Sequence, residues 1–230
     1  MNHPIRPTST PSLRRLMVAT CLLGMISLSL TGCAQAVLLG YLIGGPPSIE
    51  PAFETETKKS IVGTGEKVVV ICYADPGVRL KHAKIDYEMS SRVASMFAEN
   101  NIKVVEPEYV RDWIDKHRDW ETADEVGEAL GAKYVVEIEL IDFSLYEENS
   151  AILFRGRTEG SVNCYLLSEG GHSEKIFATD LSFTFPLSQP RTSYETTEVD
   201  FKREYLSRLS EMIGQYFYPR YHGDRYSWAT

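Results

Sequence analysis

The spacing of apolar positions predicts strands and helices from residue 66 onward. A continuous apolar run at residues 67–73 is typical of a central strand that is buried on both faces. Over residues 85–100, apolar side chains recur three and four positions apart, which predicts a helix with one buried face. Residues 102–105 then predict a short second strand. The folded part of the chain therefore begins with a β-α-β unit.

Two helices are expected between this second strand and the next one. Pro107 suits the first turn of a helix, where its missing N–H is not needed. Thr122 and Glu125 have the spacing of a capping box, which marks the start of the second helix. Gly131 is expected at the left-handed position that ends that helix.

A hairpin of two long strands is predicted at residues 134–146 and 152–166. In both strands apolar side chains alternate with polar ones, which predicts one buried and one exposed face. A three-residue loop at 147–149 would place Glu139 opposite Arg157. We therefore interpret the charged positions as a ladder of ion pairs on a solvated face, formed by Glu137, Glu139, Arg155 and Arg157.

A strand at residues 175–185 and an amphipathic helix at residues 201–217 complete the predicted fold. The predicted order of elements is β-α-β-α-α-β-β-β-α. This order indicates a single α+β domain, with a mixed β-sheet of about five strands and helices packed on it.

The start of the chain predicts a lipoprotein signal. Residues 16–45 carry no charge and follow a basic head without acidic residues. The apolar core has the length of a secretory signal and ends in Leu30, Thr31, Gly32 and Cys33, which resemble the lipobox of bacterial lipoproteins. Cys33 is therefore expected to become the acylated N-terminus that anchors the protein in a lipid bilayer. Two alternatives stay open: residues 16–45 are long enough to span a membrane, and Cys33 could follow an ordinary signal peptide.

This interpretation divides the chain into four parts. They are a signal peptide at residues 1–32, a lipidated N-terminus and membrane-proximal linker at 33–65, the α+β domain at 66–217 and an aromatic tail at 218–230. The mature protein is expected in the cell envelope, facing the periplasm. In enteric bacteria, Asp after the lipidated cysteine retains a lipoprotein in the inner membrane. Because Ala34 follows Cys33 here, we expect the outer membrane.

The charge of the mature chain argues against nucleic-acid binding. Residues 1–32 hold three of the 24 basic residues and none of the 32 acidic ones, so the remainder has a formal net charge of −11. Affinity for a phosphate backbone comes from neutralising Lys and Arg side chains, which are outnumbered here.

Cys72 and Cys164 are the two cysteines inside predicted strands. An oxidising compartment permits a disulfide between them, but two separately buried thiols are favoured because nothing in the pattern brings them together. No pair of Cys or His residues has the spacing of a metal site, so no metal is expected.

The sequence contains no recognisable catalytic motif and no phosphate-binding glycine pattern. Glu137 and Glu139 could form an acid–base pair, but their alternation with apolar residues favours the ladder described above. We therefore expect a protein that is not an enzyme and carries no cofactor.

Two segments are candidates for binding a partner protein. The first is the loop at residues 74–82, which leaves the end of the first strand, where α/β sheets often place binding loops; its candidates are Asp75, Arg79, Lys81 and His82. The second is the tail, in which aromatic rings and arginines occur together as in binding hot spots; its candidates are Tyr218, Arg220, Tyr221, Arg225, Tyr226 and Trp228. In the alternative interpretation, the tail folds back over a sheet edge or a helix seam.

The frame of the domain resembles a known family. Its features are the apolar strand at residues 68–71, the strand at 102–106 and the segment Leu-Gly-Ala-Lys-Tyr-Val-Val at 130–136, followed by the long hairpin. These features are similar to the periplasmic lipoprotein domains of the type found in LpoB, in CsgG and in the N-terminal part of TolB. The resemblance covers roughly residues 66–217 and implies a non-enzymatic role in docking, assembling or regulating envelope machinery.

Two departures from that family limit what the resemblance implies. The linker is short, whereas the LpoB type has a long tether. The polar face of the hairpin is too charged to face lipid, as the pore-forming hairpins of the CsgG type do. We therefore carry over neither specific activity. The resulting hypothesis is a lipid-anchored interaction, assembly or regulatory module of the envelope. The alternatives are an accessory lipoprotein of an envelope transporter and a glycan hydrolase that uses Glu137 and Glu139.

Overall fold

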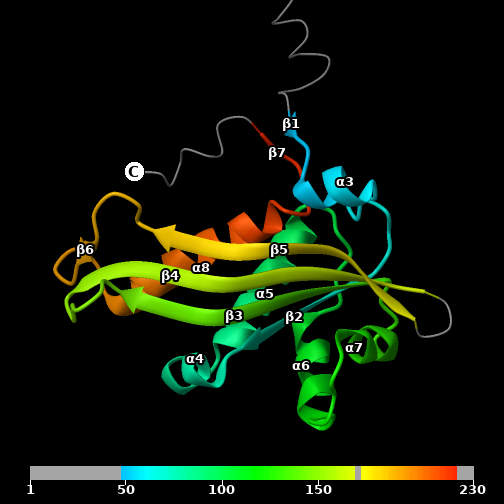
Figure 1. Cartoon of the computed structure of the whole chain (residues 1–230), viewed down its shortest axis with the longest axis horizontal. Helices are drawn as coiled ribbons and strands as arrows, with labels where there is room; N and C mark the ends of the chain where they lie inside the picture. Colours follow the sequence, from blue (N-terminus) through cyan, green and yellow to red (C-terminus); the bar gives the residue numbers. More distant parts are fainter. Residues whose placement is uncertain (1–47, 169–171, 222–230) are drawn as a thin grey trace, which may run out of the picture. The chain divides into compact units, whose positions relative to one another are not determined.

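Among the described residues, five strands form one mixed sheet (Figure 1), and two short strands near the ends of the described chain form a separate pair. The computed structural model describes residues 48–168 and 172–221. The four longer strands lie side by side in the order β2 (Val68–Ala74), β3 (Tyr134–Tyr146), β4 (Leu153–Leu167) and β5 (Ser173–Phe185), and the short β6 (Arg191–Thr192) also pairs with β4. β2 and β3 are parallel, and all other pairs in this sheet are antiparallel. The predicted α+β fold with a mixed sheet of about five strands is confirmed.

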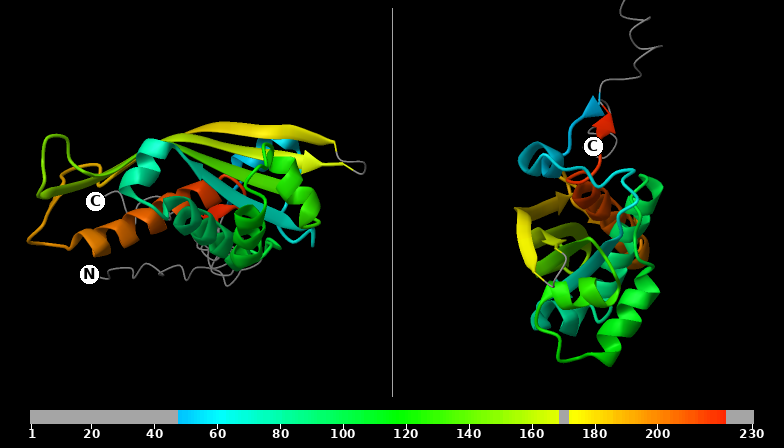
Figure 2. Two further views of the ribbon diagram at one scale, coloured as in Figure 1. Left: turned by 90° about the horizontal axis from the view of Figure 1, so that it is seen from below. Right: turned by 90° about the vertical axis from the view of Figure 1, so that its right-hand side faces the viewer.

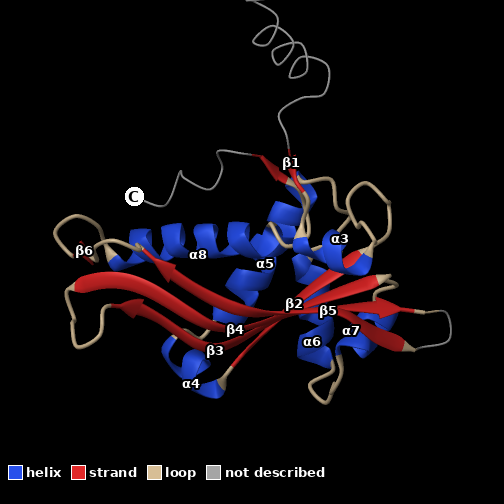
Figure 3. Cartoon of the chain, turned by 45° about the horizontal axis from the view of Figure 1, so that its top comes forward, coloured by secondary structure: helices blue, strands red, loops and turns tan. Residues whose placement is uncertain are grey.

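Helices cover both faces of this sheet. One face of the sheet, here called the inner face, is covered by α5 (Ile85–Glu99) and α8 (Glu198–Gly214). These two helices also pack against each other (Figure 2). On the outer face, α6 (Pro107–Lys116) packs against β2, and α7 (Ala123–Ala129) packs against β2, β3 and β4 (Figure 3). The order of these helices agrees with the prediction, but α8 begins and ends three residues earlier than the predicted range of 201–217.

The inner face of the sheet forms the main core. Val136, Ile138 and Leu140 on β3 are fully buried there, as their alternation with Glu137 and Glu139 predicts. Among the described residues, the largest fully buried side chain is that of Tyr205 on α8. Its hydroxyl is 2.7 Å from the Thr158 hydroxyl and donates to the Phe183 carbonyl at 3.1 Å, so the polar end of the ring is satisfied inside the core.

A smaller core lies under α6 and α7. Val69 and Ile71 of β2 point outward into it, while Val68 and Val70 point into the main core. This arrangement explains why residues 67–73 form a continuous apolar run.

The predicted strand at residues 102–105 is reduced to a single parallel bridge between Val68 and Val104. The Val68 amide donates to the Lys103 carbonyl at 2.8 Å, and the Val105 amide donates to the Val68 carbonyl at 2.9 Å. Pro107 then begins α6, which turns the chain away from the sheet. Only the first part of the outer edge of β2 is therefore paired.

Part of the segment expected to be a linker packs into the main core. Residues Ala52–Thr57 form helix α3, and the side chains of Phe53 and Ile61 are fully buried. The ring of Phe53 lies 5.4 Å from that of Phe217 and 5.8 Å from that of Phe177, measured between centroids. The described fold therefore includes residues upstream of position 66.

The ends of α7 follow the sequence signals. The Glu125 carboxylate accepts hydrogen bonds from the Thr122 amide at 3.1 Å and from the Thr122 hydroxyl at 2.9 Å. Gly131 has a φ of 62°, which is the left-handed conformation expected after the helix.

The predicted register of the long hairpin is wrong. Glu139 lies opposite Ser161, and Arg157 lies opposite Ser144. The strands separate earlier than expected, because the Glu147 amide donates to the Leu153 carbonyl and residues 147–152 form the loop. Two further irregularities interrupt the pairing, one between Leu140 and Asp142 and one between Ser144 and Tyr146.

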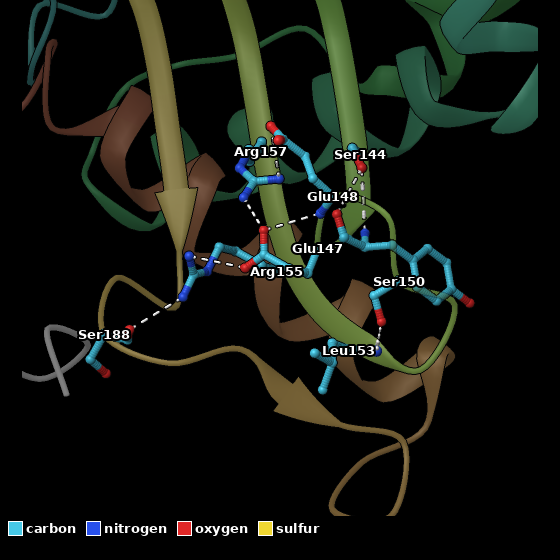
Figure 4. Close-up of polar contacts among 9 residues, drawn as sticks. Ser144, Glu147, Glu148, Ser150, Leu153, Arg155, Arg157 and Ser188 are labelled. Carbon is cyan, nitrogen blue, oxygen red and sulfur yellow. Dashed lines mark hydrogen bonds and ion pairs between the residues drawn. The ribbon is translucent and has the colours of Figure 1, made fainter.

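The predicted ladder of ion pairs is wrong for the same reason. Arg155 and Arg157 both pair with the carboxylate of Glu147 at the end of β3, with the Arg155–Glu147 distance at 3.0 Å (Figure 4). Arg155 also donates to the Ser188 carbonyl at 3.2 Å, which ties the loop after β5 to this end of the hairpin. The arginines therefore stabilise the hairpin loop instead of pairing with Glu137 and Glu139.

Candidate functional site

A cleft of about 650 Å³ lies along the outer edge of β2, between α5 and α6. Its floor is the edge of the strand from Val70 to Tyr73, and both inward- and outward-facing residues of β2 line it. One wall is the first part of α5, and the other is formed by α6 and the segment that follows it. The cleft is open because the chain leaves the sheet at Pro107, one bridge after Val104.

The backbone at the floor of this cleft is an unpaired strand edge. Neighbouring residues of a strand direct their N–H and C=O groups to opposite edges. The Lys67 carbonyl and the Asp75 amide bond to β3, whereas both groups of Val68 bond outward to residues 103 and 105. Val70 and Cys72 lie two and four positions after Val68 in the strand. Their N–H and C=O groups therefore point to the same edge as those of Val68, into the cleft. Within residues 48–168 and 172–221, these groups have no hydrogen-bond partner.

The two walls differ in chemistry. The α6 wall is apolar at its base, where Val110, Ile114 and Trp120 pack together with the small core. The α5 wall is polar and includes Asp86, Tyr87 and Ser90. An extended segment that lies in the cleft would therefore meet polar groups on one side and apolar groups on the other.

Four acidic and four basic side chains line the cleft, and only two of the acidic ones, Asp86 and Glu137, are not exposed; Asp115 and Glu121 are exposed. Asp86 and Glu137 are half-buried, and neither pairs with a cation in the part of the chain that the structure describes. The basic residues of the lining are all exposed at its rim; they are Arg79, Lys84, Arg111 and Arg118. Two of them stack on aromatic rings: the Arg111 guanidinium lies 4.6 Å from the Tyr87 centroid, and that of Arg79 lies 5.4 Å from the Tyr73 centroid.

Glu137 belongs to a hydrogen-bonded group on the outer face of the sheet. Its carboxylate accepts from the Tyr165 hydroxyl at 3.0 Å and from the Asn163 amide at 3.3 Å. Burial, and after it the hydrogen bond to Glu137, raises the pKa of the Tyr165 hydroxyl, which keeps this donor protonated. Glu139 accepts from the Ser161 hydroxyl at 3.2 Å. Polar neighbours on β4 therefore take the place that the sequence analysis assigned to arginines.

The segment after β2 contributes one of its four candidate residues to the cleft. It forms the short helix α4 (Pro76–Lys81), in which Asp75 serves as the N-cap and accepts from the Gly77 amide at 2.7 Å. Arg79 lines the cleft, whereas Asp75, Lys81 and His82 lie outside its lining.

His82 is half-buried, and one side of its ring packs on the core. Its ring meets the Phe143 ring edge-on, with centroids 4.9 Å apart. Burial, and after it the charge of Lys202, lowers the pKa of this imidazole. His82 therefore contributes packing contacts next to the core as well as an exposed edge.

The beginning of the aromatic tail is part of the fold. Tyr218 is buried in the main core, where the absence of a side chain at Gly214 leaves room for its ring. The short strand β7 (Arg220–Tyr221) pairs antiparallel with β1 (Ser48–Ile49). These residues match the alternative in which the tail folds back, and Tyr218 is not available as a surface contact. Arg225, Tyr226 and Trp228 lie outside the described residues, as do Cys33 and the lipobox residues Leu30, Thr31 and Gly32.

Cys72 lines the cleft as a free thiol, and Cys164 is a free thiol in the main core. The structure thus agrees with two separate cysteines. Among the described residues, no group of Cys, His, Asp and Glu side chains is arranged to hold a metal ion, and no helix has the length and apolarity to cross a membrane.

A second depression, of about 700 Å³, lies on the far side of residues 103–105. It is mostly apolar, and its wall contains the stacked rings of Trp113 and His117, whose centroids are 4.4 Å apart. It is similar in volume to the cleft, but its walls are packed side chains at the edge of α6. The cleft at β2 is the better candidate because its floor presents backbone groups without partners.

The sequence analysis did not identify this cleft. The helices that form its walls were predicted, but the gap between them depends on how far the strand at residues 102–105 runs along β2. The one local signal is Pro107, which begins a helix immediately after that short strand.

No protein-family model and no curated protein matches the sequence. The fold is similar to several solved structures. A variant of PelC from Paraburkholderia phytofirmans, a dodecamer, matches with 9% identity over 75% of this chain and 97% of that chain, at a TM-score of 0.43. Lipoprotein GNA1162 from Neisseria meningitidis matches with 11% identity over 64% of this chain and 98% of that chain, at a TM-score of 0.39.

The LpoB C-terminal domain from Salmonella enterica matches with 11% identity over 59% of this chain and 95% of that chain, at a TM-score of 0.34. One of these similar structures is named a lipoprotein, GNA1162. Similarity at this level does not assign a function to this chain.

Proposed function

We propose that this chain is a lipid-anchored protein of the cell envelope that docks a partner protein in the cleft between α5 and α6. The observation that carries the docking role is the unpaired edge of β2 at the floor of that cleft. The anchor rests on the lipobox sequence that ends in Cys33. The outer membrane facing the periplasm is its proposed location, because Ala34 follows the cysteine.

We propose further that the protein acts by binding and not by catalysis. Glu137 and Glu139, the carboxylates of the hydrolase alternative, are engaged by hydrogen-bond donors of β4. Replacing both with Gln should leave the muropeptide and glycan profile of the cell unchanged. A changed profile would favour the hydrolase alternative. The transporter alternative differs from docking only in the identity of the partner.

The docking role is tested by photo-crosslinking in cells. A photoreactive residue at Arg118, on the rim of the cleft, should give a crosslink to one defined partner. The matched control is Tyr194, which is 95% exposed and lies outside the cleft. If Arg118 gives no crosslink beyond that seen from Tyr194, the cleft is not a docking site.

The anchor is tested separately by metabolic labelling with a clickable fatty acid. The protein should incorporate the label, and Cys33→Ser should abolish incorporation. Labelling that persists in the Cys33→Ser protein would contradict the proposed anchor.

A further inference from the structure

We infer that the partner enters the cleft as an extended basic segment, which adds a strand to the outer edge of β2. This inference rests on the proposed docking function and specifies the chemistry of the docked segment. The main observation behind it is that the N–H and C=O groups of Val70 and Cys72 point into the cleft and have no hydrogen-bond partner in the described chain. Peptides that bind sheet edges use such groups for affinity and side-chain pockets for specificity.

The edge is partly shielded from water. Val70 is only 3% exposed, and Cys72 is half-buried. Buried backbone groups without partners are rare, because each lost hydrogen bond is costly. Residues 103–105 satisfy Val68 by lying beside it as a strand. An incoming strand would do the same for the backbone groups of Val70 and Cys72.

The side chains of the cleft select a basic segment. Alternate side chains of an added strand would face the α5 wall and the α6 wall in turn. On the α5 side they would meet Asp86, and on the other side they would meet Ile114 and Trp120, with Glu137 beside them. The half-buried carboxylates of Asp86 and Glu137 have no cationic partner in the described chain, whereas all four basic lining residues are exposed, as are the acidic Asp115 and Glu121. Lys or Arg at alternate positions, with apolar residues between them, fits this arrangement.

The geometry disfavours a second copy of this chain as the occupant. Two copies would have to pair β2 with β2 through a symmetric contact. The edge of β2 lies at the floor of a cleft between two helices, so the helix walls of both copies would collide before the strands met. A single extended segment has no such walls.

The first test uses the full-length protein and a synthetic hexapeptide in which Val and Lys alternate. Calorimetry should show binding, and an otherwise identical peptide with alternate backbone amides methylated should bind at least about tenfold more weakly, because it lacks the donors of an added strand. Asp86→Asn should weaken binding of the unmodified peptide by about fivefold. Equal binding of the two peptides would show attraction by charge alone and would overturn the inference.

The second test changes the protein instead of the peptide. Cys72→Pro removes the N–H group that points into the cleft and places the proline ring at that edge of β2. The hydrogen bonds between β2 and β3 are kept, because they come from the odd-numbered residues of β2. Cys72→Val is the matched control, because it changes the side chain and keeps the N–H. We expect Cys72→Pro to bind the peptide at least about tenfold more weakly than Cys72→Val. The methylated peptide decides the question on wild-type protein if Cys72→Pro does not fold.

The outcomes separate this inference from the proposed function. If the hexapeptide does not bind at about 1 mM while Arg118 still crosslinks a partner, the cleft docks its partner in another way and strand addition is wrong. If neither experiment gives a signal, both the docking function and the inference fail.

Discussion

Val68 and Val104 form one parallel bridge, and the outer edge of β2 is unpaired beyond it. The bridge is short because Pro107 begins α6 three residues after Val104. The unpaired edge of β2 therefore forms the floor of a cleft, and α5 and α6 form its walls. The docking function and the strand-addition inference both depend on this one relationship.

The first prediction concerns the close approach of β3 and β4 at Gly160. A Cβ atom at Gly160 would collide with the carbonyl oxygen of Glu139 on the neighbouring strand. Gly160→Ala should therefore destabilise the protein by about 3 kcal/mol, because backbone atoms cannot move aside as a side chain would. Urea unfolding measures this loss.

Gly131→Ala is the comparison for that experiment. Gly131 has a φ of 62° and open space around it, so the substitution introduces backbone strain without a collision. Its loss should be about 1 kcal/mol. Equal losses at the two glycines would contradict the observed contact between Gly160 and β3.

Phe53 tests whether the folded domain extends upstream of residue 66. Its ring is fully buried among Phe177, Phe217 and Tyr134. Phe53→Ala should reduce the free energy of unfolding by about 4 kcal/mol, whereas the exposed Glu56→Ala should change it by less than about 0.5 kcal/mol. If both variants unfold like the wild type, this segment is a linker after all.

The hydroxyl of Tyr205 tests the polar contact inside the main core. It contacts the Thr158 hydroxyl and the Phe183 carbonyl, and both Tyr205 and Thr158 are fully buried. Tyr205→Phe should cost about 1–2 kcal/mol, because Thr158 loses its side-chain partner while the ring volume is kept. Tyr194→Phe, at a residue that is 95% exposed, is the control and should change nothing measurable. A neutral Tyr205→Phe would show that the contact contributes no net stability.

His82 should make stability depend on pH in the mildly acidic range. Burial, and after it Lys202, lowers the pKa of its imidazole in the folded state, although Glu198 and Glu88 partly oppose this. The unfolded chain takes up the proton at about pH 6.5, before the folded chain does. The stabilising contribution of His82 is therefore complete above that pH and is lost as the pH falls below it.

The measurement is the melting temperature of wild-type and His82→Gln protein between about pH 7.5 and 5.5. The wild type should lose more stability than His82→Gln as the pH falls, because Gln does not titrate. Parallel curves would mean that the packing of His82 on Phe143 does not depend on its charge.

The sequence predicted what depends on local spacing. The alternation of Val136, Ile138 and Leu140 with two glutamates correctly identified the buried face of β3, and the capping box at Thr122 and Glu125 correctly marked the start of α7. These patterns are reliable because burial and capping act within a few residues.

The register of the hairpin was not predictable in the same way. A shift between Leu140 and Asp142 and another between Ser144 and Tyr146 change which residues face each other, and neither leaves a clear mark in the sequence. Phe53 was missed because the segment around it is polar and follows a Gly- and Pro-rich stretch, although it packs against residues more than a hundred positions away.

The cleft was missed because it is a gap left between correctly predicted elements. Its two half-buried carboxylates, Asp86 and Glu137, come from α5 and β3 and share no local motif. Only the arrangement in space shows that both flank the unpaired edge of β2.

Amide hydrogen exchange at Val70 and Cys72 tests the central claim most directly. It is measured by NMR on the full-length protein, with and without the hexapeptide of alternating Val and Lys. Bound peptide should slow exchange at these two amides, because they would donate to the added strand. Val69 and Ile71, whose amides already face β3, are the internal controls and should change little. Peptide that binds while Val70 and Cys72 exchange as fast as before would contradict strand addition at the edge of β2.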